Sequence, residues 1–473
     1  EDGAVRCPPA YREIYAQWIE AGWQGLPAGE AHGGQGLPFA LAAAMKELLT
    51  TADHAFSLCP TLSWGAIELL ETHATEDQAA RLLPPLVSGT WNGTMCLTEP
   101  QAGSDLAGVR TRAEPLGDGR YALHGQKIYI TYGENDLSAN TLHLVLARLP
   151  DAPAGSRGIS LFACAKRRAD GSANALRCGG LERKLGIHAS PTCVMLFEGA
   201  EAELIGEPHR GLPAMFAMMN NARLQVGMEG VAAGARALHL AERYAAERVQ
   251  GGRPIARHPD VARMLAEMRA MTLAGRFLAY EACVAADLAR GGDDLAAARL
   301  ALLTPIVKAW CTDRGVEAAS LGVQVFGGMG FVEDTGAAQV LRDSRITPIY
   351  EGTNGIQALD LVTRKVARDQ GATLRAMLAA ARETDARLGP AADALEQATR
   401  WILAAAPEEA AASASAYLEA CGWLLGAAQL ARAAQLDARY APMAAFFRTR
   451  LLPRCEARCA EMAGAGEVLA LIA

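Results

Sequence analysis

The chain has 473 residues, of which 51% are hydrophobic and 21% are charged, and its formal net charge is −7. This length predicts roughly two to four domains, and the apolar content is enough for a large core. The Lys and Arg residues are dispersed, which argues against a nucleic-acid partner, because a nucleic-acid surface needs clustered positive charge.

The order of predicted elements divides the chain into four regions. Residues 1–90 predict an N-terminal helical domain, because their apolar residues recur at helical spacing. Residues 91–208 contain short apolar segments bounded by turn residues, which predict strands of a middle β-barrel domain. Residues 209–365 return to helical stripes with short connections and predict a bundle of long helices. The predicted fold class is therefore mainly α with a central β-domain.

The last region, residues 366–473, is rich in alanine and predicts a helical C-terminal extension of roughly four helices. Breaks between these helices are expected at Gly389-Pro390, at Pro407 and near Pro442. Alanine is only weakly hydrophobic, so we expect these helices to pack on the main body or on a partner subunit.

The cysteines and the chain ends bear on the cellular location. The 11 cysteines are odd in number and scattered, which is typical of reduced thiols in a cytosolic protein. No apolar run reaches the roughly 18–20 residues of a membrane span, and no signal peptide is visible. We therefore expect a cytoplasmic protein. The first residue is Glu1 rather than Met, so we expect the natural start to be missing.

Glu351 is the leading candidate for a catalytic residue. It stands between an aromatic residue and a glycine, Tyr350 and Gly352, in an apolar stretch. A carboxylate held partly out of water has a raised proton affinity and is suited to act as a base. The ordinary alternative is an acid near a helix start that accepts backbone N–H groups.

Four segments occur in a characteristic order: Leu97–Asp105, Lys127–Thr131, Gln324–Phe331 and Pro348–Gln357. Together they resemble the acyl-CoA dehydrogenase family over roughly residues 1–365. The resemblance implies a helical domain, a β-barrel and a helical bundle in that order, with FAD as the cofactor and an acyl-CoA as the substrate.

The extension is similar to that of a subclass with larger subunits. This subclass includes enzymes that act on 3-methylmercaptopropionyl-CoA (MMPA-CoA) and broad-range fatty acyl-CoA dehydrogenases. The segment Lys184–Thr192 looks like the MMPA-CoA branch, with His188 where conventional members usually have Arg. Against the family, the N-terminal helical domain looks short and is expected to be incomplete.

The resemblance implies a role for each residue of the Tyr-Glu-Gly-Thr motif. Glu351 would remove the α-proton of the thioester while a β-hydride passes to flavin N5, giving a trans-2-enoyl-CoA. Tyr350 and Gly352 would contact the substrate, and Thr353 would lie against the flavin or its pyrophosphate. Electrons would then pass to an electron-transfer flavoprotein.

Other residues are implied to bind FAD or substrate. The segment Met95–Ser104 resembles a flavin loop whose backbone N–H and C=O groups hydrogen-bond to the polar edge of the ring. Ser104 can also contact CoA. Arg223 aligns with an arginine near the active centre. The implied cofactor-binding residues outside the catalytic motif are Met95, Cys96, Thr98, Gly103, Ser104, Tyr129, Thr131, Arg248, Gln250, Gln324, Gly327 and Gly328.

Each of these residues also has an ordinary structural interpretation. Tyr129 and Thr131 are common strand residues, an Arg at a helix end such as Arg248 often makes a solvated ion pair, and two glycines can simply end a helix. In the family, Gln324, Gly327 and Gly328 contact FAD of a neighbouring subunit, which implies a homodimer or a dimer of dimers. His residues are scattered, so no metal site is predicted.

Two alternative functions remain open from the sequence. The same fold occurs in DNA-binding flavoproteins of the alkylation response, but these are expected to concentrate basic residues in the extension. Here the extension mixes Arg with acids such as Glu383, Asp385 and Glu396. An acyl-CoA oxidase, which gives its electrons to oxygen, is the second alternative.

Overall fold

The structure is a computed structural model that describes residues 4–471, and its helices account for 64% of the chain. The chain forms two compact units. The first consists of Glu1–Ala42 and Asp53–Ala222, and the second consists of Ala43–Ala52 and Arg223–Ala473. A ten-residue segment near the N-terminus is therefore grouped with the C-terminal unit.

Two of the helices that precede the sheet begin at side-chain caps. The Asp53 carboxylate accepts the backbone N–H of Phe56 (3.0 Å), and Thr75 and Gln78 form a reciprocal capping box. Apolar residues of the two capped helices pack in one core with the strands that follow. The helices before the sheet are α1 (Pro9–Glu20), α2 (Phe39–Ala52), α3 (His54–His73) and α4 (Glu76–Val87), and the Ala43–Ala52 part of α2 belongs to the second unit.

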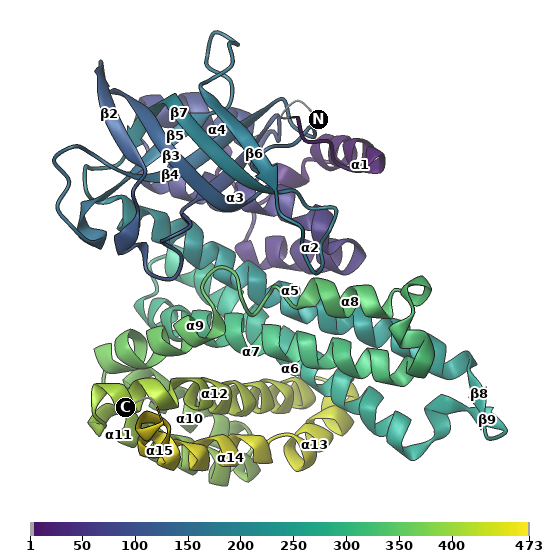
Figure 1. Ribbon diagram of the computed structural model, residues 1–473. Helices are drawn as coiled ribbons and strands as arrows, with labels where there is room; N and C mark the ends of the chain where they lie inside the picture. The colour runs from purple at the N-terminus through teal and green to yellow at the C-terminus, as the bar shows by residue number, and fades with distance from the viewer. Residues whose placement is uncertain (1–3, 472–473) are drawn as a thin grey trace. The chain divides into compact units, whose positions relative to one another are not determined.

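The first unit also contains a seven-stranded sheet (Figure 1). Its order is β1-β4-β2-β3-β7-β5, with β6 paired to β7, and a further β4–β5 pairing closes the ring. The predicted central β-barrel is thus confirmed. The strands are β1 (Trp91–Cys96), β2 (Arg112–Gly117), β3 (Arg120–Thr131), β4 (Asn140–Arg148), β5 (Ile159–Ala165), β6 (Leu176–Leu181) and β7 (Thr192–Ile205).

The second unit is built on three long helices that pack side by side. Close approach needs glycine: a Cβ added at Gly230 would lie 2.4 Å from the Cys311 carbonyl oxygen, and one at Gly315 equally close to the Gly230 oxygen. The helices and the small hairpin of this part are α5 (Gly211–Glu247), β8 (Val249–Gln250), β9 (Arg253–Pro254), α6 (Pro259–Arg290), α7 (Asp294–Phe326), α8 (Ala337–Ser344) and α9 (Asn354–Asp360).

One stretch of the described residues, Asp294–Phe331, is long and apolar enough to cross a membrane by length and composition. It consists of α7 and the turn after it. Within the most apolar window, 67% is buried in the protein. A helix at the centre of a bundle has the same composition, because it is apolar on every side.

The extension has more helices than the sequence predicted. We expected about four, and the structure has six in the described residues up to 471, because short 3₁₀ turns and prolines divide the last part further. Several of these helices lie against α6 and α7 in the same unit (Figure 1). They are α10 (Ala372–Thr384), α11 (Gly389–Ala404), α12 (Pro407–Leu436), α13 (Ala441–Arg450), α14 (Pro453–Glu461) and α15 (Ala465–Ala470).

A tryptophan pair joins the extension to the bundle. Trp423 of α12 meets Trp310 of α7 edge to face, with ring centroids 5.2 Å apart, and both are fully buried. The guanidinium groups of Arg314 and Arg454 lie over the Trp423 ring at 4.7 and 4.9 Å. A Cβ at Gly422 would lie 2.2 Å from the Trp310 ring, so the two helices could not pack this closely with a larger residue there.

Candidate active site

The candidate base lies in a strained turn between α8 and α9. Glu351 has a φ of +55°, and Gly352 follows with a φ of +85°. A left-handed backbone is uncommon for a residue with a Cβ and costs of the order of 1–3 kcal/mol. The turn is held by the amide of Gln357, which donates to the carbonyls of Glu351 (3.2 Å) and Gly352 (3.3 Å). The backbone N–H of Asn354 also donates to the Pro348 carbonyl at 2.9 Å.

Burial makes the Glu351 carboxylate a good proton acceptor near neutral pH. The residue as a whole is half-buried, and burial of its carboxylate raises its pKa to about 7. Arg223 and Lys308 act in the opposite direction, and Glu229 adds to the rise. A group with this pKa is partly ionised at pH 7, which is the condition that favours general-base catalysis.

Arg223 comes from α5 and is almost fully buried. Its Nη1 lies 3.4 Å from Asp360 Oδ2, and Arg364 Nε lies 2.6 Å from the other oxygen of the same carboxylate. Burial lowers the pKa of Arg223, while Asp360 and Glu351 raise it. The structure therefore brings the predicted arginine into the electrostatic environment of Glu351.

Lys308 is a buried cation that the sequence interpretation missed. It lies on α7, is fully buried, and donates from Nζ to Asn354 Oδ1 at 2.8 Å. Burial lowers the pKa of Lys308 to about 8, and the nearby Glu351 and Asp313 oppose that shift. Asn354 also donates to the Asp313 carboxylate at 2.8 Å. The available signal was a lone lysine within the apolar stretch Leu302–Trp310.

A second missed group is a buried ion pair next to Tyr350. Lys46 Nζ lies 2.8 Å from Glu229 Oε1, and neither side chain is more than 2% exposed. The hydroxyl of Tyr350 donates to the other oxygen of the Glu229 carboxylate. The predicted substrate-contacting tyrosine is thus fixed by a charged network, which its sequence context does not reveal.

The predicted flavin segments meet in the first unit around Glu99. Its carboxylate accepts from Lys127 Nζ (2.8 Å), from the Thr111 hydroxyl (2.6 Å) and from the backbone N–H of Arg110 (2.7 Å). Lys127 also donates to the Leu97 carbonyl at 2.9 Å. The loop after β1 and the strand β3 are therefore tied together directly before the predicted flavin-facing residues.

Tyr129 is the feature of this region that most favours a bound aromatic group. It has a φ of +62°, sits at an irregularity in the β3–β7 pairing, and is 60% exposed. An exposed aromatic residue in a strained backbone is typical of a binding surface. The neighbouring Ile128 N–H donates to the Thr98 carbonyl at 2.9 Å, so Thr98 and Tyr129 lie on adjoining segments. The residues present thus fit the planar ring of a flavin.

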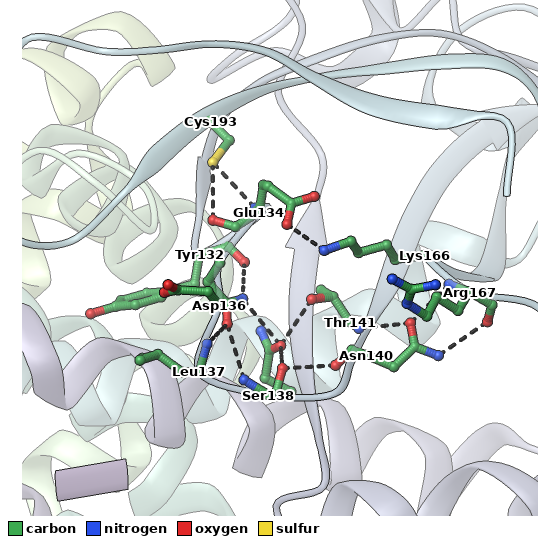
Figure 2. Close-up of polar contacts among 12 residues, drawn as sticks. Tyr132, Glu134, Asp136, Leu137, Ser138, Asn140, Thr141, Lys166, Arg167 and Cys193 are labelled. Atoms are coloured by element: carbon green, nitrogen blue, oxygen red, sulfur yellow. Dashed lines mark hydrogen bonds and ion pairs between the residues drawn. The ribbon is translucent and has the colours of Figure 1, made fainter. Parts of the chain in front are cut away.

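The loop that follows Thr131 is fixed by polar contacts (Figure 2). Figure 2 shows Lys166 reaching the Glu134 carboxylate and the Cys193 sulfur against the Glu134 backbone. The phenol of Tyr132 donates to the Ala55 carbonyl at 2.9 Å. These contacts hold the end of β3, and with it the position of Thr131, in place.

The remaining predicted residues of the first unit differ in exposure. Gly103 and Ser104 are exposed, whereas Thr98, Thr131 and Met95 are half-buried. The Cys96 side chain is fully buried in the barrel core. The Cys96 side chain is therefore not available to a cofactor.

Other predicted cofactor residues lie far from the base within the same chain. Arg248 and Gln250 are exposed at the β8–β9 hairpin, after the end of α5 (Figure 1). Arg223 lies in the N-terminal half of that helix, so roughly 36 Å of helix separates it from Arg248. The exposed residues Gln324, Gly327 and Gly328 lie at the end of α7. Thr353 caps α9, its hydroxyl oxygen accepting the Ile356 N–H at 3.3 Å.

Sequence models of the acyl-CoA dehydrogenase family match three consecutive parts of the chain. The N-terminal domain matches residues 4–90, the middle domain residues 94–200 and the C-terminal domain residues 209–367.

Individual relatives show the same similarity. The chain is 44% identical to 3-methylmercaptopropionyl-CoA dehydrogenase of Ruegeria pomeroyi, over 99% of this chain and 88% of that protein. It is 33% identical to a butyryl-CoA dehydrogenase of Syntrophomonas wolfei, over 80% of this chain and 66% of that protein. The crystal structure of Caenorhabditis elegans ACDH-11 in complex with C11-CoA is similar with a TM-score of 0.81 at 25% identity. That match covers 93% of this chain and 79% of the other.

Proposed function

Because this chain belongs to the acyl-CoA dehydrogenase family, we propose that it desaturates an acyl-CoA thioester between its α and β carbons. In this reaction Glu351 takes the α-proton, and the β-carbon loses a hydride, so that a trans-2-enoyl-CoA is formed. The observation that carries the proposal is the Glu351 carboxylate itself, which lies in a strained turn and has a pKa raised by burial to about 7.

Two buried cations support the role of Glu351. Arg223 on α5 and Lys308 on α7 interact electrostatically with its carboxylate and lower its pKa. Without them, burial would hold the carboxyl group in its protonated form, which cannot act as a base. Their positive charge keeps part of the carboxylate ionised while its environment still excludes enough water to keep it basic.

Family members are FAD-binding flavoproteins, and bound FAD supplies the acceptor for the hydride. Tyr129 and Thr131 would lie beside the flavin ring, and the backbone of Met95–Ser104 would form hydrogen bonds with the polar edge of the ring. The Glu99–Lys127 ion pair supports this assignment, because it joins the two segments that carry these residues. Thr353 and Gly352 would contact the ligands from the turn of Glu351.

The distant cofactor residues favour an oligomer. Arg248 and Gln250 lie just after the C-terminal end of α5, roughly 36 Å along the helix from Arg223, and Gln324 lies at the exposed end of α7. We propose that Gln324, Gly327 and Gly328 bind FAD of a neighbouring subunit in a homodimer or dimer of dimers, and that Arg248 and Gln250 contact the FAD pyrophosphate. An electron-transfer flavoprotein is the proposed electron acceptor, and the cytoplasm the proposed location.

The substrate proposed first is MMPA-CoA. The relative from Ruegeria pomeroyi that carries this substrate in its name is 44% identical over 99% of the chain. The Lys184–Thr192 segment adds local support, and its His188 ring nitrogen contacts the Lys184 carbonyl at 2.8 Å. A straight-chain acyl-CoA of short length is the main competitor, since a butyryl-CoA dehydrogenase is 33% identical.

Anaerobic bleaching of FAD-loaded protein tests the proposal. The panel contains MMPA-CoA and saturated acyl-CoAs of increasing chain length, added to wild type and to Glu351→Gln. Bleaching in wild type and its loss in Glu351→Gln are expected, with Glu333→Gln as the control, because Glu333 is an exposed acid paired with Arg342. No bleaching of bound FAD by any member of the panel would refute the dehydrogenation. Peroxide release in air would instead identify an oxidase.

A further inference from the structure

Two adjacent residues of α2, Lys46 and Glu47, form buried ion pairs within the second unit. Lys46 pairs with Glu229 of α5. One position further, Glu47 accepts from Arg276 Nε (2.8 Å) and from the Tyr280 hydroxyl (3.0 Å), both on α6. These contacts place the Ala43–Ala52 segment against the bundle, with which it forms one compact unit.

The first of these two contacts leads to the active site. The Glu229 carboxylate holds Lys46 with one oxygen and the Tyr350 hydroxyl with the other. Tyr350 directly precedes Glu351, whose backbone lies in the left-handed region. A chain of three side chains thus connects α2 to the turn of the base.

The same chain affects Glu351 electrostatically. Glu229 is a second buried carboxylate, and its charge disfavours ionisation of Glu351. Arg223 and Lys308 act on Glu351 directly from α5 and α7. Lys46 differs from both because it neutralises the competing carboxylate, from a helix at the other end of the sequence.

We propose that Lys46 is a positioning residue for the base: its ammonium group neutralises Glu229, which then holds Tyr350 without adding an uncompensated negative charge beside Glu351. The inference rests on the proposed function only in taking Glu351 as the base. It explains why a lysine is tolerated at a fully buried site, where an unpaired ammonium group would be very unfavourable.

The proposal is tested by titrating Glu351 in FAD-loaded protein without substrate. Carboxyl ¹³C NMR of glutamate-labelled protein follows the titration, and Glu351→Gln assigns the resonance. Lys46→Met should raise the titration midpoint of Glu351 by about one pH unit, because the Glu229 charge becomes uncompensated. The double variant Lys46→Met/Glu229→Gln removes both charges and should return the midpoint to the wild-type value.

Two further variants separate electrostatics from loss of packing. Lys46→Arg keeps the charge and should leave the midpoint unchanged. Glu47→Gln breaks the neighbouring contact of the same helix and should lower the unfolding temperature without moving the midpoint. In anaerobic bleaching at pH 7, Lys46→Met should be about five-fold slower, which is the loss of ionised base that a one-unit shift produces.

A Glu351 midpoint that is the same in wild type and Lys46→Met would overturn the inference, as would a double variant that fails to restore it. The titration needs no turnover, so it remains informative if the proposed reaction is wrong. Absence of bleaching in wild type, or bleaching that persists in Glu351→Gln, would show that the proposed function is wrong, while the midpoints would still report on Lys46.

Discussion

Glu99 in the β-domain and Glu351 in the helical bundle are both acids near a buried lysine. Their pKa values nevertheless shift in opposite directions from the ordinary value of a glutamate. Burial would raise the pKa of Glu99, but Lys127, the Thr111 hydroxyl and the Arg110 N–H together lower it to about 2. Burial raises the pKa of Glu351 to about 7, and the opposing cations only limit the rise.

The contrast lies in hydrogen bonding rather than in residue type. The Glu99 oxygens accept several hydrogen bonds, including a direct one from the Lys127 ammonium at 2.8 Å. The Lys308 ammonium donates instead to Asn354 Oδ1, so it acts on Glu351 through space. A carboxylate whose ionised form is fully hydrogen-bonded is a structural element, whereas one stabilised only by nearby charges remains able to take a proton.

The largest expected effect is on turnover. Glu351→Gln should lower the rate of flavin reduction by about 10²–10⁴-fold, because an amide cannot accept the α-proton. Its unfolding free energy at pH 7 should not fall, since the substitution removes a charge that burial disfavours. Stopped-flow absorbance and chemical denaturation measure the two quantities. Retention of more than a tenth of the wild-type rate would remove Glu351 from the role of base.

Glu99→Gln should lower the unfolding free energy, the quantity that Glu351→Gln should not lower. Removing one partner of a buried ion pair leaves Lys127 without its counter-charge and should cost about 3–5 kcal/mol of unfolding free energy. Chemical denaturation measures this loss, and the double variant Glu99→Gln/Lys127→Met should recover part of it. The matched control is Glu114→Gln, which breaks an exposed pair with Arg112 and should cause a much smaller loss. Equal losses in both single variants would contradict the contrast.

The two acids should also affect stability in different pH ranges. The pKa of Glu99 is lowered on folding, so its contribution is present above its unfolded pKa and is lost as pH falls from about 5 to about 2. The pKa of Glu351 is raised, so its contribution is present below its unfolded pKa and is lost as pH rises from about 4 to about 7. Each lost contribution is of the order of 3 kcal/mol.

Denaturation curves of the single variants at several pH values measure this difference. Glu99→Gln should flatten the acid side of the stability profile, and Glu351→Gln should flatten the decline toward neutral pH. Profiles that keep the wild-type slope in both ranges would show that other groups control the pH dependence.

The sequence predicted the parts of this comparison that depend on local pattern. Helical spacing and strand-like segments predicted the order of helical domain, barrel and bundle, and a four-residue motif pointed to Glu351. The charges that set its proton affinity were missed, because Lys46, Glu229 and Lys308 come from helices distant in sequence. Their pairing is decided by tertiary packing, although a lone lysine inside an apolar helix was a usable signal at both positions.

The smallest expected effect concerns Lys308. Lys308→Gln keeps a group that can donate to Asn354 but removes the positive charge that favours the ionised form of Glu351. The apparent pKa in the pH profile of flavin reduction should therefore rise by about one pH unit, and the rate at pH 7 should fall about five-fold. Lys308→Arg retains the charge and should keep the wild-type profile if the larger group fits. Because the wild-type lysine has its own pKa lowered to about 8, the two profiles should converge as pH rises through that value. A Lys308→Gln profile that stays displaced by the same amount above pH 9 would show that the lysine acts on the turn through its hydrogen bond and not through its charge.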